Sequence, residues 1–130
     1  MLFRSLFDID RFKDINDRAG HLAGDAVIRH VARAARAAVR EADVLCRWGG
    51  DEFLVLLKGC TRDAAGRIAA KIGERVHGNE AEHGGRAIDV TVSLGVAEYR
   101  PGEEADQLLT RADGALGAAK AGGRQRVVAA

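Results

Sequence analysis

The chain has 130 residues, of which 47% are hydrophobic and 30% charged, and its formal net charge is +1. This length favours a single domain, and the composition excludes an intrinsically disordered chain. A near-neutral charge argues against a nucleic-acid partner, and the apolar runs are too short to cross a membrane. The start has no signal-peptide pattern, and Cys46 and Cys60 match no metal or redox spacing, so we expect reduced thiols in a cytoplasmic protein without membrane contact.

Hydrophobic periodicity predicts elements in the order β-α-α-β-β-α-β-α-β. In chain order they are a central strand at 2–8, helices at 11–18 and 22–41, strands at 44–48 and 53–57, a helix at 62–77, a strand at 87–99, a helix at 104–121 and a short strand within 124–128. Asp10 is the expected N-cap of the first helix, residues 78–86 are expected to form a polar loop, and the apolar strand 53–57 should be covered on both faces. We therefore expect an α+β fold, a ferredoxin-like or polymerase-palm-like mixed β-sheet flanked by helices.

The stretch RWGGDEFLVLL, residues 47–57, places two glycines and two acids at the tip of a predicted hairpin. Glycine takes positive φ freely and lets a ligand approach closely, but a lone GGDE turn is more often a set of solvated charges. Asp8, at the end of the first strand, changes this balance, because it would come near Asp51 if that strand lies beside the hairpin. Two such carboxylates repel each other unless a cation lies between them, and Mg²⁺ prefers carboxylates together with substrate phosphates.

Cationic side chains suited to phosphate oxygens accompany these acids. Lys120 and Arg124 stand four residues apart at the glycine-rich end of the last helix, and Lys13 is close to Asp8 in sequence. An ordinary helix end with cations that complement its dipole is the alternative reading. Acids for a metal and cations for phosphates are the equipment of phosphoryl or nucleotidyl transfer, whereas no Ser, Cys or Lys has a convincing base for a nucleophilic route.

Four segments together carry a family resemblance: FDIDRFKDINDRAGHLAGD, RWGGDEF, VTVSLGVA and RADGALGAAKAGGRQRV. In these segments the chain closely resembles the GGDEF family of diguanylate cyclases, from about Leu6 to Val128, with a GGDEF hairpin at the active site. The resemblance implies that two GTP molecules are condensed into cyclic di-GMP with release of two pyrophosphates. It also implies a homodimer, in which two domains face each other about a two-fold axis and each holds one GTP.

The resemblance implies a role for each matching residue. The ligands of Mg²⁺ or Mn²⁺ would be Asp8, the carbonyl of Ile9 and Asp51. Glu52 would assist with the metal or with deprotonating the attacking hydroxyl, which makes the catalytic group Asp8, Asp51 and Glu52. The remaining substrate contacts would be Gly49 and Gly50 beside the nucleotide, Asn16 and Asp25 at guanine, Lys13, Lys120 and Arg124 at phosphates, and His21 in a supporting role.

A second, inhibitory site is implied by READ, residues 40–43, which begins nine positions before the first hairpin glycine. It matches the RxxD motif at which the family binds cyclic di-GMP as a product inhibitor, through Arg40 and Asp43. Arg67 and Lys71, four apart on one helix face, match the basic positions that complete it. Read alone, the four letters would indicate only a helix end with a solvated arginine.

The chain also departs from the family pattern. Members usually begin with a further helical segment that carries an Asp-x-Leu-Thr-x-Leu-x-Asn-Arg motif. We therefore expect residues 1–130 to be a single catalytic domain without that helix, cut off from an upstream sensory or regulatory region of a larger, even membrane-bound, protein. Gly117 replaces a common tyrosine and Gln125 a common asparagine. We therefore expect part of the sheet to be uncovered and activity to be low. The alternatives are a weak or inactive domain that binds GTP or cyclic di-GMP, and a cyclase for another nucleotide, against which Asp25 argues.

Overall fold

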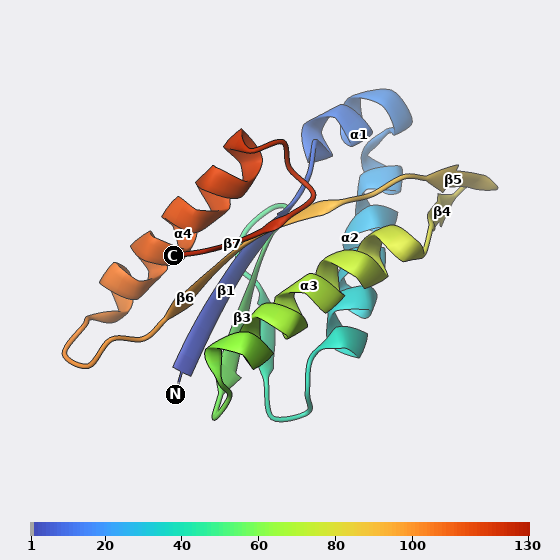
Figure 1. Ribbon diagram of the computed structural model, residues 1–130. Coiled ribbons are helices and arrows are strands. Elements are labelled where there is room, and N and C mark those ends of the chain that lie inside the picture. Colours follow the sequence, from blue (N-terminus) through green and yellow to red (C-terminus); the bar gives the residue numbers. More distant parts are fainter. Residues whose placement is uncertain (1) are drawn as a thin grey trace.

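The fold is built on a five-stranded mixed sheet with the strand order β2-β3-β1-β6-β7 (Figure 1). The computed structural model describes residues 2–130. Its elements are β1 (Leu2–Ile9), α1 (Phe12–Ala19), α2 (His21–Ala38), β2 (Val44–Arg47), β3 (Glu52–Lys58), α3 (Arg62–Gly78), β4 (Ala81–His83), β5 (Arg86–Ile88), β6 (Val92–Glu98), α4 (Ala105–Ala121) and β7 (Val127–Ala129). β7 runs parallel to β6 and the other sheet pairs are antiparallel. The expected α+β class and the central place of the first strand are confirmed.

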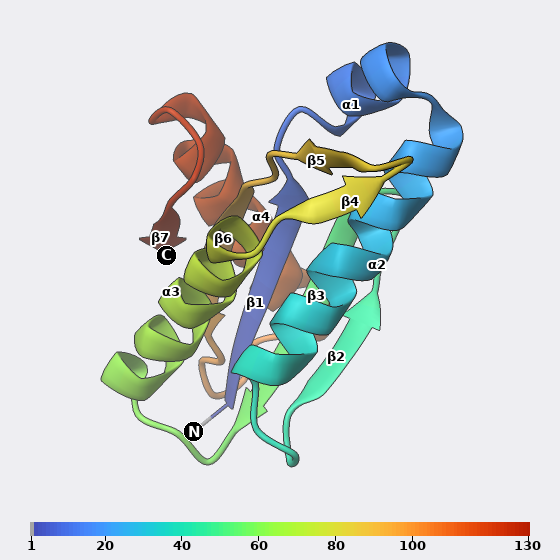
Figure 2. The ribbon, with the colours of Figure 1, turned by 90° about the vertical axis from the view of Figure 1, so that its right-hand side faces the viewer.

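Helices cover both faces of this sheet, α2 and α3 on one side and α4 on the other (Figures 1 and 2). The main core packs under α2 and α3, and it includes the stacked rings of Phe7 and Phe53, whose centroids are 5.2 Å apart. A smaller cluster under α4 contains Leu6, Leu54, Ala97, Leu108, Ala112 and Leu116. β3 is therefore covered on both faces as expected, although Leu56 is only half-buried.

The segment that was expected to be a polar loop forms part of a second, two-stranded sheet. β4 and β5 pair antiparallel, with His83 opposite Arg86 across a two-residue turn. The turn residues Gly84 and Gly85 have φ of 60° and 77°, and two consecutive positive values are what a tight hairpin turn requires. The strand predicted at 87–99 is correspondingly divided into β5 and β6, and β4 packs against α2.

Asp10 does not cap α1, contrary to the expectation from sequence. The N-cap is Arg11, which has φ 54° and makes no side-chain capping bond. The Asp10 carboxylate is buried and accepts hydrogen bonds from Thr91 Oγ1 at 2.7 Å, Ser93 Oγ at 2.6 Å and the Gln125 N–H at 3.1 Å. It thus joins the end of β1 to β6 and to the segment after α4.

The face that carries α4 is only partly covered by residues 2–130. α4 packs against β1, β6 and β7. On the β2 side of this face, Val44 is 46% exposed and Cys46 is half-buried, and Trp48, just after β2, is 52% exposed. In the described part of the chain, none of the helices is both long and apolar enough to cross a bilayer.

Candidate active site

The acids predicted to meet do lie side by side at one end of the sheet. Asp8 is the penultimate residue of β1 and pairs with Glu52 at the start of β3. The Ile9 N–H donates to the Asp51 carbonyl at 3.1 Å. Because β3 is anchored in the core through Phe53, the hairpin acids are held against the end of a central strand.

Burial and crowding disfavour the charged forms of two of these acids. Burial raises the pKa of Asp8; Lys120 lowers it, and the charges of Asp51 and Asp113 add to the rise. Burial likewise raises the pKa of Glu52, followed by repulsion from Asp8 and Asp113. A carboxylate cluster of this kind becomes more stable when a cation enters it.

The donor set around Asp8 fits a hard divalent cation. Lys120 Nζ donates to Asp8 Oδ2, while Asp8 Oδ1 is buried without a hydrogen-bond partner within residues 2–130. That described range holds no group of three His, Cys, Asp or Glu side chains arranged as a complete metal site. Two carboxylates and a carbonyl nevertheless suffice for Mg²⁺, which is usually completed by water and substrate phosphates.

Glycine allows both a positive φ and the close approach of a ligand, and only the second applies to the two hairpin glycines. Neither Gly49 nor Gly50 has a positive φ, so the turn itself does not require glycine. Its shape is held by Trp48 and Gly49 N–H groups donating to the Glu52 carbonyl and by Arg47, which donates to the Gly50 carbonyl. A Cβ at either glycine would meet no heavy atom within 4 Å, so the glycines leave open space beside the acids.

The residues predicted to read guanine lie on α1 and α2. Asn16 is half-buried, and its Oδ1 is a buried acceptor without a partner in the part of the chain that the structure describes. Gly24 makes room for it, since a Cβ there would stand 1.8 Å from that oxygen. Asp25 and His21 are exposed in the first turns of α2. Gly24 was missed in the sequence, where it looks like one of several glycines in a connector.

The predicted phosphate cations do not all occupy equivalent positions. Lys13 is exposed on α1, and Arg124 is half-buried in the turn after α4. Lys120 is engaged with Asp8, which places the C-terminal end of α4 at the acid cluster.

Asp113 was also missed, although its charge acts on both Asp8 and Glu52. It lies on α4, seven residues before Lys120, and this spacing puts the two side chains on one face of the helix. It lines a cavity of about 250 Å³ together with Leu6, Trp48, Glu52, Leu109 and Thr110. The spacing from Lys120 could have identified it.

The RxxD residues form a tight pair at the start of β2. Arg40 donates from Nη2 to Asp43 Oδ1 at 2.6 Å and from Nε at 3.0–3.1 Å, and its Nη2 also donates to the Lys58 carbonyl. Burial would raise the pKa of Asp43, but the bonds and charge of Arg40 outweigh it and the pKa lies below its ordinary value. Arg67 and Lys71 are exposed on α3 and, among residues 2–130, no hydrogen bond or ion pair joins them to this pair.

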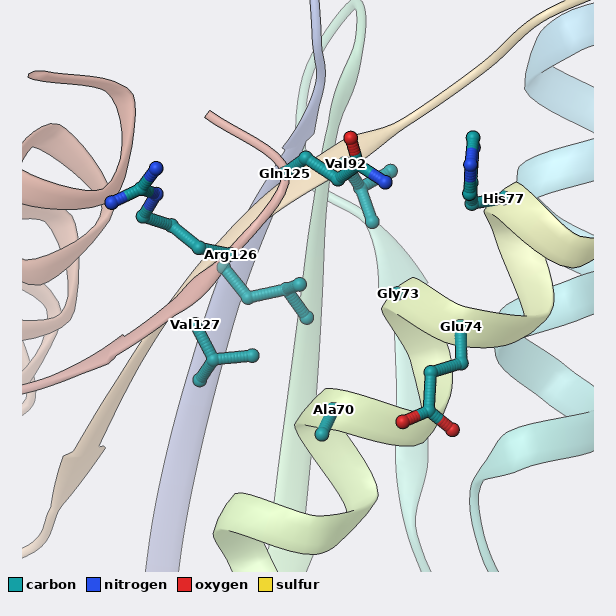
Figure 3. Close-up of a pocket in the computed structure, with 9 residues that line it drawn as sticks. Ala70, Gly73, Glu74, His77, Val92, Gln125, Arg126 and Val127 are labelled. Carbon is teal, nitrogen blue, oxygen red and sulfur yellow. The ribbon is translucent and has the colours of Figure 1, made fainter. Parts of the chain in front are cut away.

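A separate cavity of about 380 Å³ lies between α3, β6 and the segment that leads into β7 (Figure 3). Its floor is apolar, with Val92 and Val127, and Glu74 and His77 lie on the α3 side. It contains none of the residues predicted to bind substrate or metal.

Comparisons with known proteins agree with this geometry. Residues 4–126 match the family described as "Diguanylate cyclase, GGDEF domain". The chain is 42% identical over 123 residues to diguanylate cyclase A of Treponema denticola, covering 94% of this chain and 33% of that protein. It is 43% identical over 126 residues to the response regulator PleD of Caulobacter vibrioides, covering 95% and 28%.

Solved structures extend the likeness to the fold. The diguanylate cyclase SiaD of Pseudomonas aeruginosa, crystallised with its activator SiaC, superposes with a TM-score of 0.96 at 40% identity, covering 99% of this chain and 50% of that one. The GGDEF domain of DgcB from Caulobacter crescentus, in complex with c-di-GMP, gives 0.94 at 34% identity, covering 98% and 77%. The chain spans about a third or less of the full length of diguanylate cyclase A of Treponema denticola and of PleD. With a match over residues 4–126, the chain belongs to the GGDEF, or diguanylate cyclase, domain family.

Proposed function

We propose that this chain is the single catalytic domain of a diguanylate cyclase, which condenses two GTP molecules into cyclic di-GMP and two pyrophosphates. The observation that carries the proposal is the approach of β1 to the hairpin, which brings Asp8 beside Asp51 and Glu52. The family membership and the names of its relatives support it.

In each of the two condensations, the 3′-hydroxyl oxygen of one GTP bonds to the α-phosphorus of the other. The bond between that phosphorus and the bridging oxygen to the β-phosphate breaks, and pyrophosphate leaves with the electron pair. The hydroxyl proton passes to a base. Glu52 suits this part, because a carboxyl whose pKa is raised is a stronger base than an ordinary glutamate.

Asp8, the Ile9 carbonyl and Asp51 would hold Mg²⁺ or Mn²⁺ at this site. Such an ion supplies charge neutralisation at the phosphates and orients them for in-line attack. Asp8 Oδ1 is available for it, and Lys120 would exchange Asp8 Oδ2 for a phosphate oxygen as nucleotide binds. Lys13 and Arg124 would complete the phosphate contacts, in the space that Gly49 and Gly50 leave open.

Guanine would be recognised between α1 and α2. The unpartnered Asn16 Oδ1 needs a donor, and guanine offers N–H groups on its Watson–Crick edge. Asp25, which is exposed, can accept from the same edge. Such a site would reject adenine, because adenine lacks the N1–H and N2–H donors of guanine and leaves the buried Asn16 Oδ1 unpaired. His21 would support the neighbouring backbone.

One domain holds one nucleotide, so the reaction needs a second copy facing the first about a two-fold axis. An upstream sensory region would control how often the two copies meet. Arg40 and Asp43 would bind cyclic di-GMP, with Arg67 and Lys71 as further cations. Product binding there must favour a non-productive arrangement, since otherwise it could not inhibit.

Incubation with GTP and Mg²⁺ at high protein concentration, followed by chromatographic product analysis, tests this proposal. Cyclic di-GMP and pyrophosphate are expected in a 1:2 ratio, and Asp51→Ala should abolish both without unfolding the protein. A folded wild-type protein that yields no cyclic di-GMP at any concentration would contradict it.

A binding module for cyclic di-GMP is the second candidate, favoured by the preformed Arg40–Asp43 pair. Titration calorimetry with cyclic di-GMP separates the two functions. Binding without turnover would support the module. In an active enzyme, Arg40→Ala should relieve product inhibition and leave initial turnover unchanged.

A further inference from the structure

Asp10 is a buried acid to which the proposed chemistry assigns no task. Its carboxylate is saturated by three donors from segments more than 80 residues away in the chain: Thr91, Ser93 and Gln125. Its own N–H donates to the Thr91 carbonyl at 2.9 Å. These three hydrogen bonds hold the carboxylate in one position. One of them, from the Gln125 N–H, comes from a strained turn.

That turn follows α4 and contains two consecutive non-glycine residues in the left-handed region, Arg124 at φ 65° and Gln125 at φ 47°. Residues with a Cβ adopt this conformation only where the surroundings hold them, and such strain gathers at functional sites. Bonds to other segments hold the turn: the Arg124 N–H donates to the Ala119 carbonyl, the Gln125 N–H to Asp10 Oδ2, and the Leu94 N–H to the Arg126 carbonyl. Of these, only the Asp10 bond reaches the turn from the residue that directly follows β1, the strand that carries Asp8.

Arg126 closes the turn from its other side. Its Nε donates to the Arg124 carbonyl at 3.0 Å, and its guanidinium nitrogens lie 2.9 and 2.7 Å from where a Cβ on Gly122 or Gly123 would stand. Figure 3 shows the guanidinium of Arg126 and the side chain of Gln125 leaving this segment in opposite directions. The backbone conformation at residues 124 and 125 therefore determines where the Arg124 side chain starts.

We propose that Asp10 is a positioning residue, which locks the Arg124–Gln125 turn so that Arg124 is presented to the phosphates of the nucleotide. This inference rests on the proposed function, in which Arg124 binds phosphate. Asp10 stands two residues after Asp8, so the metal-binding acid and the phosphate-binding arginine share one rigid frame. Asp10 itself touches neither nucleotide nor metal.

Equilibrium binding of GTP with Mg²⁺, and of guanosine, to the whole chain tests the proposal. Asp10→Ala should weaken GTP binding by about tenfold, the loss expected when a charged phosphate contact is misplaced, and leave guanosine binding unchanged. In an Arg124→Ala background the same substitution should have no further effect. Asp10→Asn should restore most of the affinity, because its amide oxygen can still accept from Gln125 while its NH₂ group donates to Ser93.

Thr91→Val is the matched control. It removes one donor to Asp10 Oδ2 but leaves the bond to Gln125, so it should lower the thermal midpoint and keep GTP affinity. If Asp10→Ala does not fold, Asp10→Ser, which is too short to reach Gln125 and leaves a smaller void, takes its place.

The inference is overturned by equal losses for GTP and guanosine, by additive losses with Arg124→Ala, or by an Asp10→Ala or Asp10→Ser variant that folds and binds GTP normally. If Arg124→Ala weakens GTP binding and Asp10→Ala does not, the positioning role of Asp10 is wrong, and the phosphate contact of Arg124 stands. Unchanged GTP binding in Arg124→Ala would contradict the phosphate contact of Arg124 and, with it, this inference. If the wild type does not bind GTP, the proposed function itself is contradicted.

Discussion

Two aspartates two residues apart, Asp8 and Asp10, show how far the surroundings of a carboxylate determine its role. In sequence both follow an apolar strand and precede a helix, but only Asp10 stands close enough to the helix to be expected as its N-cap. Asp8 keeps an unpartnered oxygen beside other acids, whereas Asp10 is saturated by three donors. The sequence could predict the first because a second acid stood in the hairpin. It could not predict the second, because the donors to Asp10 come from residues 91, 93 and 125, far along the chain.

Asp113 is a further single residue with a local effect, and removing its charge should change the pH dependence of turnover. The charge of Asp113 helps to raise the pKa of both Asp8 and Glu52. The substitution Asp113→Asn should therefore lower both pKa values and move the acid limb of the kcat/KM profile to lower pH. The raised pKa values also mean that ionising these acids costs folding free energy. The cost is absent below their ordinary pKa and complete above the raised one, so the variant should unfold at higher temperature near neutral pH.

Asp106→Asn is the control for this prediction. It removes the same charge from the exposed first turn of α4 and should leave the acid limb in place. An acid limb that moves equally in both variants would show that general charge, rather than the position of Asp113, is responsible.

At the scale of elements, the backbone of α4 lies very close to β6 at Gly95. A Cβ on Gly95 would stand 2.3 Å from the Ala112 carbonyl oxygen and 2.3 Å from the Leu116 nitrogen. Both are backbone atoms and cannot move aside alone. We expect Gly95→Ala to cost about 3 kcal/mol in the free energy of unfolding, at the upper end for overpacking, measured by urea denaturation.

Gly117→Ala supplies the opposite outcome on the same helix. A Cβ there would meet no atom within 4 Å, and alanine is better than glycine inside a helix by about 1 kcal/mol. The variant should therefore be more stable than the wild type. If Gly95→Ala and Gly117→Ala change the free energy of unfolding in the same direction, this account of how α4 packs is contradicted.

The start of α4 is held by the ion pair between Arg111 and Glu103, whose contribution to stability depends on pH. Arg111 donates to both carboxylate oxygens of Glu103, at 2.7 and 2.9 Å, and to the Glu98 carbonyl. This lowers the pKa of Glu103 to about 2. A lowered pKa stabilises the fold above the ordinary value of 4.5 and loses that effect as the pH falls toward 2.

Glu103→Gln should accordingly unfold at lower urea than the wild type at pH 7, and the difference should shrink progressively below pH 4.5. Denaturation at pH 7 and pH 3 measures it. A difference of the same size at both values would mean that the side chain stabilises through packing rather than charge.

The sequence predicted every element except the β4–β5 hairpin, and the reasons are physical. α2, α3 and α4 have sustained helical periodicity, and their predicted bounds differ from the observed ones by only a few residues. β4 and β5 have three residues each, too few for periodicity, although the glycine pair at 84 and 85 was a hairpin signal. At Gly49 and Gly50, the expected close approach of a nucleotide fits the open space beside the hairpin, whereas neither residue uses the positive φ that glycine allows.

At the scale of the whole molecule, one copy of the chain is half of the proposed active site. The acids and Lys120 lie at one end of the sheet, and residues 2–130 offer a single set of them. Val44 and Trp48 are exposed on the β2 side, but two separate side chains are not an extended hydrophobic seam. Pairing should therefore be weak, and nucleotide bridging both copies would contribute to it.

Weak pairing makes the turnover per mole of protein depend on protein concentration. When the monomer dominates, the dimer concentration rises with the square of the total, so turnover per mole of protein should rise linearly before reaching a plateau. Initial rates of cyclic di-GMP formation over a wide range of protein concentrations, at saturating GTP and Mg²⁺, measure this. A rate per mole that is constant down to the lowest concentration would mean that a single copy suffices or that the dimer is tight, and sedimentation analysis separates these two.

Mixing experiments extend the same prediction to the roles of the two copies. An excess of Asp51→Ala protein should draw the wild type into mixed pairs, in which only one half-site binds its metal. Cyclic di-GMP formation should then fall, because ring closure needs both condensations, whereas a linear product with one new phosphodiester could still appear. An excess of Thr91→Val protein, which keeps every proposed catalytic group, should cause no such fall. Equal suppression by both variants would show that the inhibition comes from crowding or substrate depletion, and that the acids of one copy do not depend on those of the other.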